Sequence, residues 1–458
     1  MYRRPLATLL TQALLALALL APFSVRAAVS ADQAAQIGQS LTSVGAEKGA
    51  SKDGRIPAWS GGASAAQFGA AFKGFKEGDF YPDLFNADKP VLKITHDNYS
   101  QYAAQLPEGA KQMLRSYPEY FLNVYPTRRT AAFPEAIYQA TKANATTAQL
   151  QGDDALTHAS VGFPFPIPQS GAEVIWNHKT RYLGGTVDQT ANIIVVDQSG
   201  SFHTAEYTQS AQFFYSNPAI PADKQQGLIF QLVRKQTAPP RLRGQVSMAW
   251  EHLDGSRDAW IYLPGTHRVL KAPTLAFDSP MAGADGGVST DQSDMFNGSL
   301  QQYSWKLLGK REMYIGYNNY HLQQPNLKYA QLIKSHHLNP DYLRYELHRV
   351  WVVEASLKQG MSNVIQRRVF YVDEDSWTIA AVDCYDSHKQ LWRYEEAHLL
   401  PLFVDHIVVP APEVVYDFSA GRYVVINLAN ELPYVAKFGV TLPADYFTPQ
   451  YLQSTGRQ

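Results

Sequence analysis

Residues 344–398 read RYELHRVWVVEASLKQGMSNVIQRRVFYVDEDSWTIAAVDCYDSHKQLWRYEEAH, and this stretch decides the fold. Its first part, residues 345–355, is rich in β-branched and aromatic side chains, which pack well on a pleated sheet. Residues 365–372, 377–385 and 390–396 have a similar composition. We therefore predict four consecutive strands.

Short polar connections join these predicted strands. The acidic tetrad at residues 373–376 favours a tight turn, because Asp and Ser side chains can hydrogen-bond the backbone there. Connections this short place neighbouring strands antiparallel, so the stretch should form a meander. In the first strand Tyr345, Leu347 and Trp351 share one face and Glu346 lies on the other. The apolar side must then be covered by the protein's own helices or by a ligand.

Residues 1–27 have the pattern of a secretory signal peptide. Arg3 and Arg4 supply a positive start, residues 9–20 form an apolar segment, and a small-residue cleavage pattern ends at Ala27. The alternative is a membrane anchor, but about 12 apolar residues are too few for a span that needs about 20. No cysteine lies near the cleavage site, so lipid attachment there is not expected. We therefore expect an exported, periplasmic protein.

Composition limits the classes of partner and cofactor. Without residues 1–27, the chain has 37 basic and 41 acidic residues, a net charge of −4, and no basic run. This balance argues against nucleic acid as a partner. The single cysteine, Cys384, cannot form an internal disulfide, and no motif for zinc, nucleotide or nucleophilic hydrolase chemistry occurs. We expect no cofactor and no bound metal, and we assign no catalytic residue.

The remaining patterns predict a mainly β fold with N-terminal helices (α+β), organised as one domain. Strand patterns dominate from about residue 170, and 45% of the residues are apolar and available for a core. Residues 28–150 should form a helical and irregular segment that packs on the sheet, and residues 151–458 a large curved antiparallel sheet or half-barrel. The expected helices are at residues 31–46, 97–106, 108–116 and 135–150, with a further short one at 329–335.

Three groups of charged residues have more than one interpretation. Arg128 and Arg129 could hold a phosphate or carboxylate of a ligand, or form structural salt bridges. Residues 373–375 could bind calcium, or serve as an acidic turn that lacks the spaced ligands of a calcium loop. His348 and Glu354 could do acid–base chemistry, but six residues along a strand separate them by roughly 20 Å.

Large apolar side chains at alternating strand positions give the candidate ligand site. A folded protein does not leave several large aromatic rings exposed in one patch unless something covers them. We predict that the concave face of the sheet lines an apolar cavity or is capped by the early helices; a solid core is the alternative. The predicted residues are Trp260, Tyr262, Trp305, Tyr345, Leu347, Trp351, Phe370, Trp377 and Trp392, with Arg128 and Arg129 as polar contacts.

Six segments carry a resemblance to a known family. They are SKDGRIPAWSGG, VYPTRRTAAFP, GFPFPIPQSGAEVIWNH, MFNGSLQQYSWKLLGKREMYIGYNN, RYELHRVWVVEA and RRVFYVDEDSW. In these segments the chain resembles the Gram-negative bacterial family called "domain of unknown function 1329", which is placed near the lipoprotein-localisation carriers LolA and LolB. The resemblance implies a half-open antiparallel β-barrel, closed by helices, around a cavity for acyl chains.

Two functions from different classes follow as hypotheses. The first is a periplasmic carrier or binding protein for a lipid or other hydrophobic ligand, with an envelope transporter or outer-membrane protein as partner. The second is a periplasmic enzyme whose site is assembled from Arg128, Arg129, His348 and Glu354; a structural role in the envelope is a further alternative. A cavity lined by aliphatic and aromatic side chains favours the carrier, and convergent His, Arg and carboxylate groups favour the enzyme.

Overall fold

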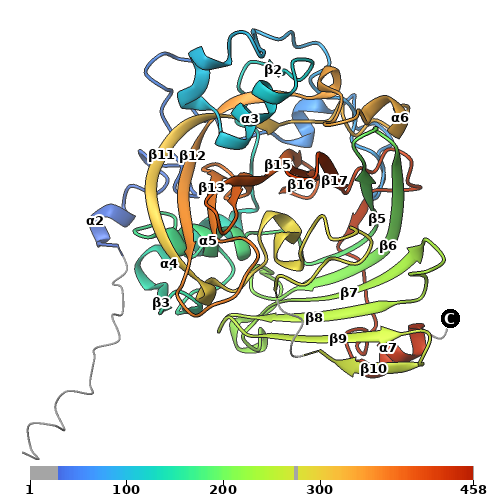
Figure 1. The fold of residues 1–458 in the computed structure, drawn as a ribbon. Coiled ribbons are helices and arrows are strands. Elements are labelled where there is room, and N and C mark those ends of the chain that lie inside the picture. Colours follow the sequence, from blue (N-terminus) through green and yellow to red (C-terminus); the bar gives the residue numbers. More distant parts are fainter. Residues whose placement is uncertain (1–28, 273–276, 457–458) are drawn as a thin grey trace, which may run out of the picture.

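The structure is a computed structural model that describes residues 29–272 and 277–456. The expected signal peptide, residues 1–27, lies outside the described residues. Within the described part of the chain, no helix has both the length and the apolar character needed to cross a bilayer. The strands build a large curved sheet, and the other segments are arranged around it (Figure 1).

Sixteen of the described strands belong to one sheet. The bounds of all strands are Leu92–Ile94 (β1), Leu122–Val124 (β2), Gln149–Gln151 (β3), Ala155–Thr157 (β4), Thr186–Val196 (β5), Phe202–Phe213 (β6), Leu228–Ala238 (β7), Val246–His252 (β8), Arg257–Leu263 (β9), Arg268–Lys271 (β10), Tyr303–Tyr317 (β11), Tyr345–Leu357 (β12), Arg367–Asp373 (β13), Ile379–Tyr385 (β14), Leu391–Leu402 (β15), Ile407–Asp417 (β16), Arg422–Ile426 (β17) and Ala436–Phe438 (β18). Their spatial order is β1-β2-β12-β13-β14-β15-β16-β17-β5-β6-β7-β8-β9-β10, with β11 on β12 and β15, and β18 on β5. β3 and β4 form a separate pair.

The predicted meander is confirmed. β12, β13, β14 and β15 pair antiparallel in succession. The acidic turn between β13 and β14 forms as expected, because the Ser376 backbone N–H and hydroxyl both donate to the Asp373 carboxylate, at 3.0 and 2.6 Å. The predicted large, curved, mostly antiparallel sheet is confirmed as well; β2 on β12 and the end of β11 on β15 are parallel contacts.

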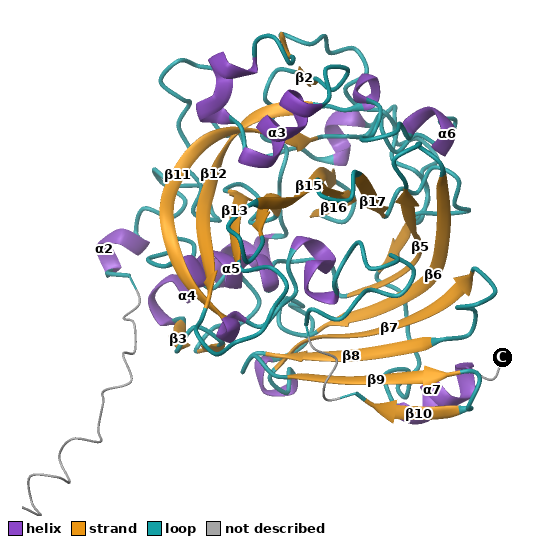
Figure 2. Cartoon of the chain, in the orientation of Figure 1, coloured by secondary structure: helices purple, strands orange, loops and turns teal. Residues whose placement is uncertain are grey.

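One end of the sheet curls into a partial ring. β11 runs antiparallel to β12 along most of its length, and its last residues then pair with β15 through Gly316 and His398. A Cβ atom at Gly316 would lie 2.9 Å from the Ala397 carbonyl oxygen, closer than real Cβ contacts. The absent side chain therefore lets β11 approach β15, and Figure 2 shows the resulting curvature of β11 and β12.

Residues 277–302, here called the plug, lie against the concave face of the sheet. Figure 1 shows this yellow segment inside the curve formed by β5, β6 and β13 to β17. The plug contains the 3₁₀ helix η5 (Thr290–Met295). Met281, Ala284 and Val288 of the plug pack in one apolar cluster with Ile193 of β5 and Val424 of β17. The plug thus fills part of the concave face and leaves the rest open.

The predicted helices are confirmed only in part. The predicted helix at 108–116 is α3 (Glu108–Ser116), that at 135–150 is α4 (Glu135–Thr147), and residues 97–106 contain a 3₁₀ helix, Tyr99–Gln105. The prediction of a helix at 31–46 is wrong beyond α2 (Ala31–Ala34). Gly38 and Gly45 have φ angles of +85° and +91°, so the backbone at these positions is not helical. The predicted short helix at 329–335 forms as α6 (Tyr329–Leu332). Helices not predicted are α5 (Gly171–Lys179) and α7 (Pro449–Gly456).

Helix α3 docks on the meander through its first turn. The backbone N–H groups of Glu108 and Gly109 donate to the Asp383 carboxylate of β14, at 2.9 and 2.7 Å. Burial raises the pKa of Asp383 to about 6, against the lowering effect of these hydrogen bonds. A Cβ atom at Gly109 would lie 2.1 Å from the ring of Tyr394 on β15. The helix therefore approaches the sheet as closely as a glycine allows.

We expect Gly109→Ala to lower the free energy of unfolding by about 1–3 kcal/mol, because the added methyl group overpacks a filled site. Alanine in a helix normally stabilises relative to glycine by about 1 kcal/mol, so the expected sign is reversed here. Gly265→Ala is the control, because a Cβ there meets nothing within 4 Å. Urea unfolding measures both, and a stabilised Gly109→Ala variant would contradict the described packing of α3.

Candidate functional site

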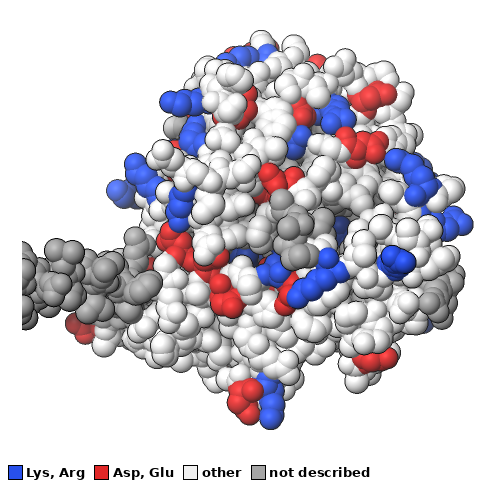
Figure 3. Space-filling model, turned by 60° about the horizontal axis from the view of Figure 1, so that its bottom comes forward, with Lys and Arg blue, Asp and Glu red and all other residues white. Residues whose placement is uncertain are grey.

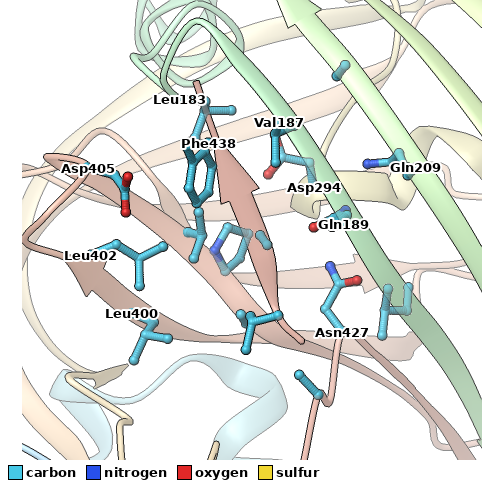
Figure 4. A pocket seen from close by; sticks show the side chains of 18 of the residues that line it. Leu183, Val187, Gln189, Gln209, Asp294, Leu400, Leu402, Asp405, Asn427 and Phe438 are labelled. Atoms are coloured by element: carbon cyan, nitrogen blue, oxygen red, sulfur yellow. The ribbon is translucent and has the colours of Figure 1, made fainter. Parts of the chain in front are cut away.

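A cavity of about 220 Å³ lies on the concave face of the sheet. β5, β6 and β7 line one side, and β15, β16 and β17 the other. Residues 293–297 of the plug, residues 75–81 and β18 complete the wall. Figure 4 shows side chains from β5, β6, β15, β18 and the plug around the shared space.

Strand alternation explains which side chains face the cavity. Gln209, Ala211 and Phe213 are alternate residues of β6, so they share the concave face of the sheet. The register pairs Ala211 with Val187 of β5 and with Leu232 of β7. All five of these residues line the cavity. One continuous strip of the sheet thus forms this wall.

The cavity has an apolar side and an amide side (Figure 4). The apolar side includes Leu183, Leu400, Leu402 and Phe438, and the amide side includes Gln189, Gln209 and Asn427. The two sides come from different parts of the chain: β15, β18 and the segment before β5 supply the first, and β5, β6 and the end of β17 supply the second. Such a division suits a ligand that has both an apolar and a polar part.

Charged groups meet where the plug reaches the cavity. Arg181 pairs with Asp294, a plug residue in the left-handed region at φ +56°. The Met295 backbone N–H donates to the Glu413 carboxyl at 3.0 Å. Burial, reinforced by the charge of Asp294, raises the pKa of Glu413 to about 8. Glu413 is therefore mostly protonated at pH 7.

A second raised carboxyl lies on the apolar side. Asp405 follows β15, and Figure 4 shows it across the cavity from Gln209. Burial raises its pKa to about 7, with Glu77 adding to the effect, and the Tyr81 hydroxyl donates to it at 3.4 Å. Part of the Asp405 population is therefore neutral at pH 7.

The outer surface in Figure 3 carries both signs of charge. Lys and Arg side chains are interspersed there with Asp and Glu, and most of this face is uncharged. No large patch of one sign interrupts it. Phosphate backbones are bound by concentrated positive charge, which this face does not offer.

Trp260 and Tyr262, predicted to face a ligand, lie on the opposite side of the sheet from the cavity. Leu232 of β7 lines the cavity, whereas its neighbour Val233 points the other way and packs with Tyr262. Helix α7 covers this outer cluster with Leu452. The two aromatic residues therefore anchor α7.

Trp305 and Phe370 lie behind the cavity wall, where the ring of Phe296 separates them from the cavity. Both pack edge-to-face against Phe296 of the plug, with ring centroids at 5.6 and 5.3 Å. Phe296 itself lines the cavity. Trp305 and Phe370 thus support a ring that faces the cavity.

Segments from the first part of the chain cover Trp351, Trp377 and Tyr345. The two indoles stack with centroids 6.2 Å apart, and the Trp377 indole N–H donates to the Val44 carbonyl at 2.9 Å. The hydroxyl groups of Tyr345 and Tyr120 lie 2.9 Å apart. These aromatic residues are thus covered by the protein itself, through Val44 and Tyr120, which lie outside the early helices.

Leu347 and Trp392 complete the predicted set. Leu347 is buried in the main apolar cluster, and its carbonyl accepts a hydrogen bond from the Thr127 hydroxyl at 2.8 Å. The Trp392 indole N–H donates to the Ser419 hydroxyl at 3.1 Å, and the Arg393 guanidinium lies 3.9 Å from its ring. None of the nine predicted apolar residues is among those that line the cavity of about 220 Å³.

Arg128 and Arg129 bind carboxylates of the protein itself. Arg128 pairs with Asp88 at 2.5 Å. Arg129 holds the Asp375 carboxylate through two hydrogen bonds, of 2.6 and 2.8 Å, and both side chains are buried. These contacts fit the alternative of structural salt bridges, and they also neutralise part of the acidic turn.

His348 lies in a buried ionic network. Its ring nitrogens lie 3.2 Å from Glu346 and 3.4 Å from Asp373. Burial lowers the pKa of His348, but the two carboxylates outweigh it and raise the pKa to about 9. Potential ligand atoms of His348, Asp373 and Asp375 lie within 4.8 Å of one another, so their spacing would suit a metal ion. The Asp375 carboxylate, however, already accepts two hydrogen bonds from the Arg129 guanidinium.

Glu354, paired with His348 in the enzyme hypothesis, lies elsewhere. It accepts a hydrogen bond from Arg367 on β13 at 3.0 Å. Of the other residues of that hypothesis, Arg129 pairs with Asp375 and His348 with Glu346. The Arg128 backbone N–H donates to the Glu346 carboxylate at 2.7 Å. These residues therefore form structural contacts between charged groups, and they lie away from the cavity.

The chain belongs to the family described as "Protein of unknown function (DUF1329)". The family model matches residues 93–453, which confirms the predicted family. A protein of Pseudomonas aeruginosa, described as uncharacterised, is 39% identical over 453 residues, covering 98% of this chain and 98% of that protein.

Three solved structures share parts of the fold at low identity. A DUF1329 family protein from Desulfovibrio piger is 16% identical, covers 59% of this chain and 92% of its own, and has a TM-score of 0.41. A putative outer membrane lipoprotein-sorting protein domain from Vibrio parahaemolyticus is 14% identical, with coverages of 62% and 98% and a TM-score of 0.43. A LolA superfamily protein from Nitrosomonas europaea is 13% identical, with coverages of 62% and 100% and a TM-score of 0.38.

Proposed function

We propose that this protein is a periplasmic carrier or binding protein for a lipid or another ligand with one apolar chain. The cavity on the concave face is the observation that supports this function. The cavity is partly open, so the Leu and Phe side chains that line it are accessible to a ligand. Its apolar lining with a few convergent polar groups is typical of small-molecule sites.

The size of the cavity limits the ligand. An engineered apolar cavity of about 150 Å³ in another protein is large enough to bind benzene. A cavity of about 220 Å³ therefore suits one aliphatic chain or its end, and not a bundle of several chains. Each buried methylene contributes about 0.8 kcal/mol, so a few of them supply useful affinity.

The location and partner of the carrier are part of the proposal. The signal-peptide pattern of residues 1–27 supports export to the periplasm. A ligand with an apolar chain dissolves poorly in water, so a protein that shields it would exchange it with a membrane. An envelope transporter or an outer-membrane protein is the partner that this role requires.

The proposal predicts that Ala211→Phe weakens binding of a fluorescent fatty-acid analogue at least tenfold. Ala211 lies between Val187 and Leu232 on the cavity wall, so the added ring enters the ligand space. Fluorescence titration of delipidated protein measures the dissociation constant, and a thermal melt checks that each variant is folded.

Gln212→Phe is the matched control, because this neighbour on β6 points to the other face of the sheet. Its affinity should stay within about twofold of the wild type. Absence of saturable binding to the wild type would refute the proposed function. Equal loss in both variants would show that the analogue binds elsewhere.

A further inference from the structure

The amide side of the cavity holds a cation that lacks an acidic partner. Two arginines, Arg181 and Arg234, line the cavity. Arg181 is paired with Asp294, whereas Arg234 forms no ion pair with any residue that the structure describes. Lys179 also lines the cavity and donates to the Gly298 carbonyl at 2.8 Å, and burial lowers its pKa. Arg234 is therefore the cavity cation best suited to meet an anion.

Neighbouring side chains fix the position of Arg234. Its Nε and one terminal nitrogen, Nη2, both donate to the Gln209 side-chain oxygen, at 3.0 and 2.7 Å. Its guanidinium lies 4.2 Å from the centre of the Tyr207 ring, a cation–π contact. Among the described residues, the other terminal nitrogen, Nη1, has no hydrogen-bond partner. A positioned guanidinium with free N–H groups is a typical carboxylate or phosphate ligand.

The amides beside Arg234 also present donors. Arginine can only donate hydrogen bonds, so Gln209 must turn its oxygen toward Arg234 and its NH₂ group away. The Tyr207 hydroxyl donates to the Asn427 side-chain oxygen at 3.2 Å, which leaves the Asn427 NH₂ group as a donor as well. Both amides line the cavity, and Figure 4 shows them on the same side. This corner therefore offers hydrogen-bond donors together with a positive charge.

We propose that the ligand is a single apolar chain with an oxyanion head, and that Arg234, Gln209 and Asn427 bind this head. The inference rests on the proposed function and names the chemical class of its ligand. The chain lies along Leu400, Leu402 and the other apolar residues, on the side opposite the amides.

The acidic groups of the cavity agree with this orientation. Asp294 is neutralised by Arg181, and Glu413 holds a proton at neutral pH because of burial. Asp405 lies on the apolar side, across the cavity from Gln209. Glu77 and Asp79 also line the cavity, and Glu77 accepts a hydrogen bond from the Phe438 backbone N–H at 2.6 Å, which places it on the apolar side. An oxyanion at Arg234 is thus across the cavity from Asp405 and Glu77.

The test compares three ligands with the same sixteen-carbon chain, chosen as probes: hexadecanoic acid, hexadecanol and 1-palmitoyl lysophosphatidylglycerol. Competition against a fluorescent analogue at pH 7.4 gives each affinity. We expect the wild type to bind at least one of the two anionic ligands at least tenfold more tightly than the alcohol. Preference for the acid would identify the head group as a free carboxylate, and preference for the lysolipid would identify it as a phosphodiester.

Arg234→Met should abolish this preference and leave the affinity for the alcohol within about twofold. Arg243→Met is the matched control, because Arg243 is exposed and does not line the cavity. Gln209→Glu is a second variant: the new carboxylate should pair with Arg234 and weaken the anionic ligands about tenfold without removing the arginine.

Failure of the oxyanion site and failure of the proposed function give different results. Equal affinity of the wild type for the alcohol and both anions would overturn the oxyanion site while the proposed function stands. Failure of all three ligands to bind would overturn the proposed function itself. An undiminished anion preference in both Arg234→Met and Gln209→Glu would also overturn the assignment of the head-binding residues.

Discussion

Asp291→Ala is expected to lower the free energy of unfolding by about 3–5 kcal/mol, since it leaves a buried guanidinium without its partner. Asp291 belongs to the plug and pairs with Arg368 of β13, and both side chains are almost completely buried. The Ser289 hydroxyl also donates to Asp291, at 2.6 Å, and the Asn363 amide does so at 3.2 Å. This pair ties the plug to the meander, so its loss should also disturb the cavity wall.

Urea unfolding with two further variants tests this account of the plug. Asp341→Ala, at an exposed position, should change stability by less than about 0.5 kcal/mol. The double variant Asp291→Ala, Arg368→Met should be at least as stable as Asp291→Ala, because it removes both buried charges. A loss below about 1 kcal/mol in Asp291→Ala would contradict the described ion pair.

Glu413→Gln is expected to stabilise the protein by about 3–4 kcal/mol at pH 8 relative to its effect at pH 5. The pKa of Glu413 is raised from its ordinary value of 4.5 to about 8 in the folded state. Between these values the unfolded state loses the proton and the folded state keeps it, so stability falls as pH rises through this window. Glutamine keeps an oxygen for the Met295 N–H and does not titrate, so the variant lacks this loss.

Denaturant unfolding of both proteins at pH 5, 6, 7 and 8 measures the difference. Other buried carboxyls, such as Glu396 and Asp383, titrate in both proteins and cancel in the comparison. Parallel stability curves for the wild type and Glu413→Gln would contradict a raised pKa at this position. A difference that grows with pH would locate a protonated carboxyl at the cavity.

The meander could be predicted because local composition and short connections determine it. β12 to β15 have strongly β-forming sequences, and the turn at Asp373–Ser376 closes through its own side chains. The family followed from six long segments. By contrast, α5 was missed although Ser170 caps its start, because residues 162–168 just before it contain three prolines, which disfavour a helix.

The cavity could not be predicted because its lining has no simple pattern. On β6 the inward residues include Tyr207, Gln209 and Ala211, a mixture of aromatic, amide and small side chains. The large aromatic residues were better candidates by size, but the plug, α7 and the early segments cover them. Which part of the sheet remains uncovered depends on where these segments pack, and they are distant from one another in sequence. Arg234 and Gln209 come together only through the pairing of β6 with β7, and strand alternation alone does not distinguish Arg234 from an exposed residue.

Photo-crosslinking with a diazirine-labelled fatty acid tests the central claim most directly. The labelled ligand is bound to delipidated protein and irradiated, and the modified peptides are identified by mass spectrometry. The cavity predicts saturable labelling of residues 183–190, 207–213 and 400–411, which unlabelled fatty acid suppresses and Ala211→Phe reduces at least tenfold. Labelling confined to the outer cluster around Trp260 or to the surface, unaffected by Ala211→Phe, would contradict binding on the concave face.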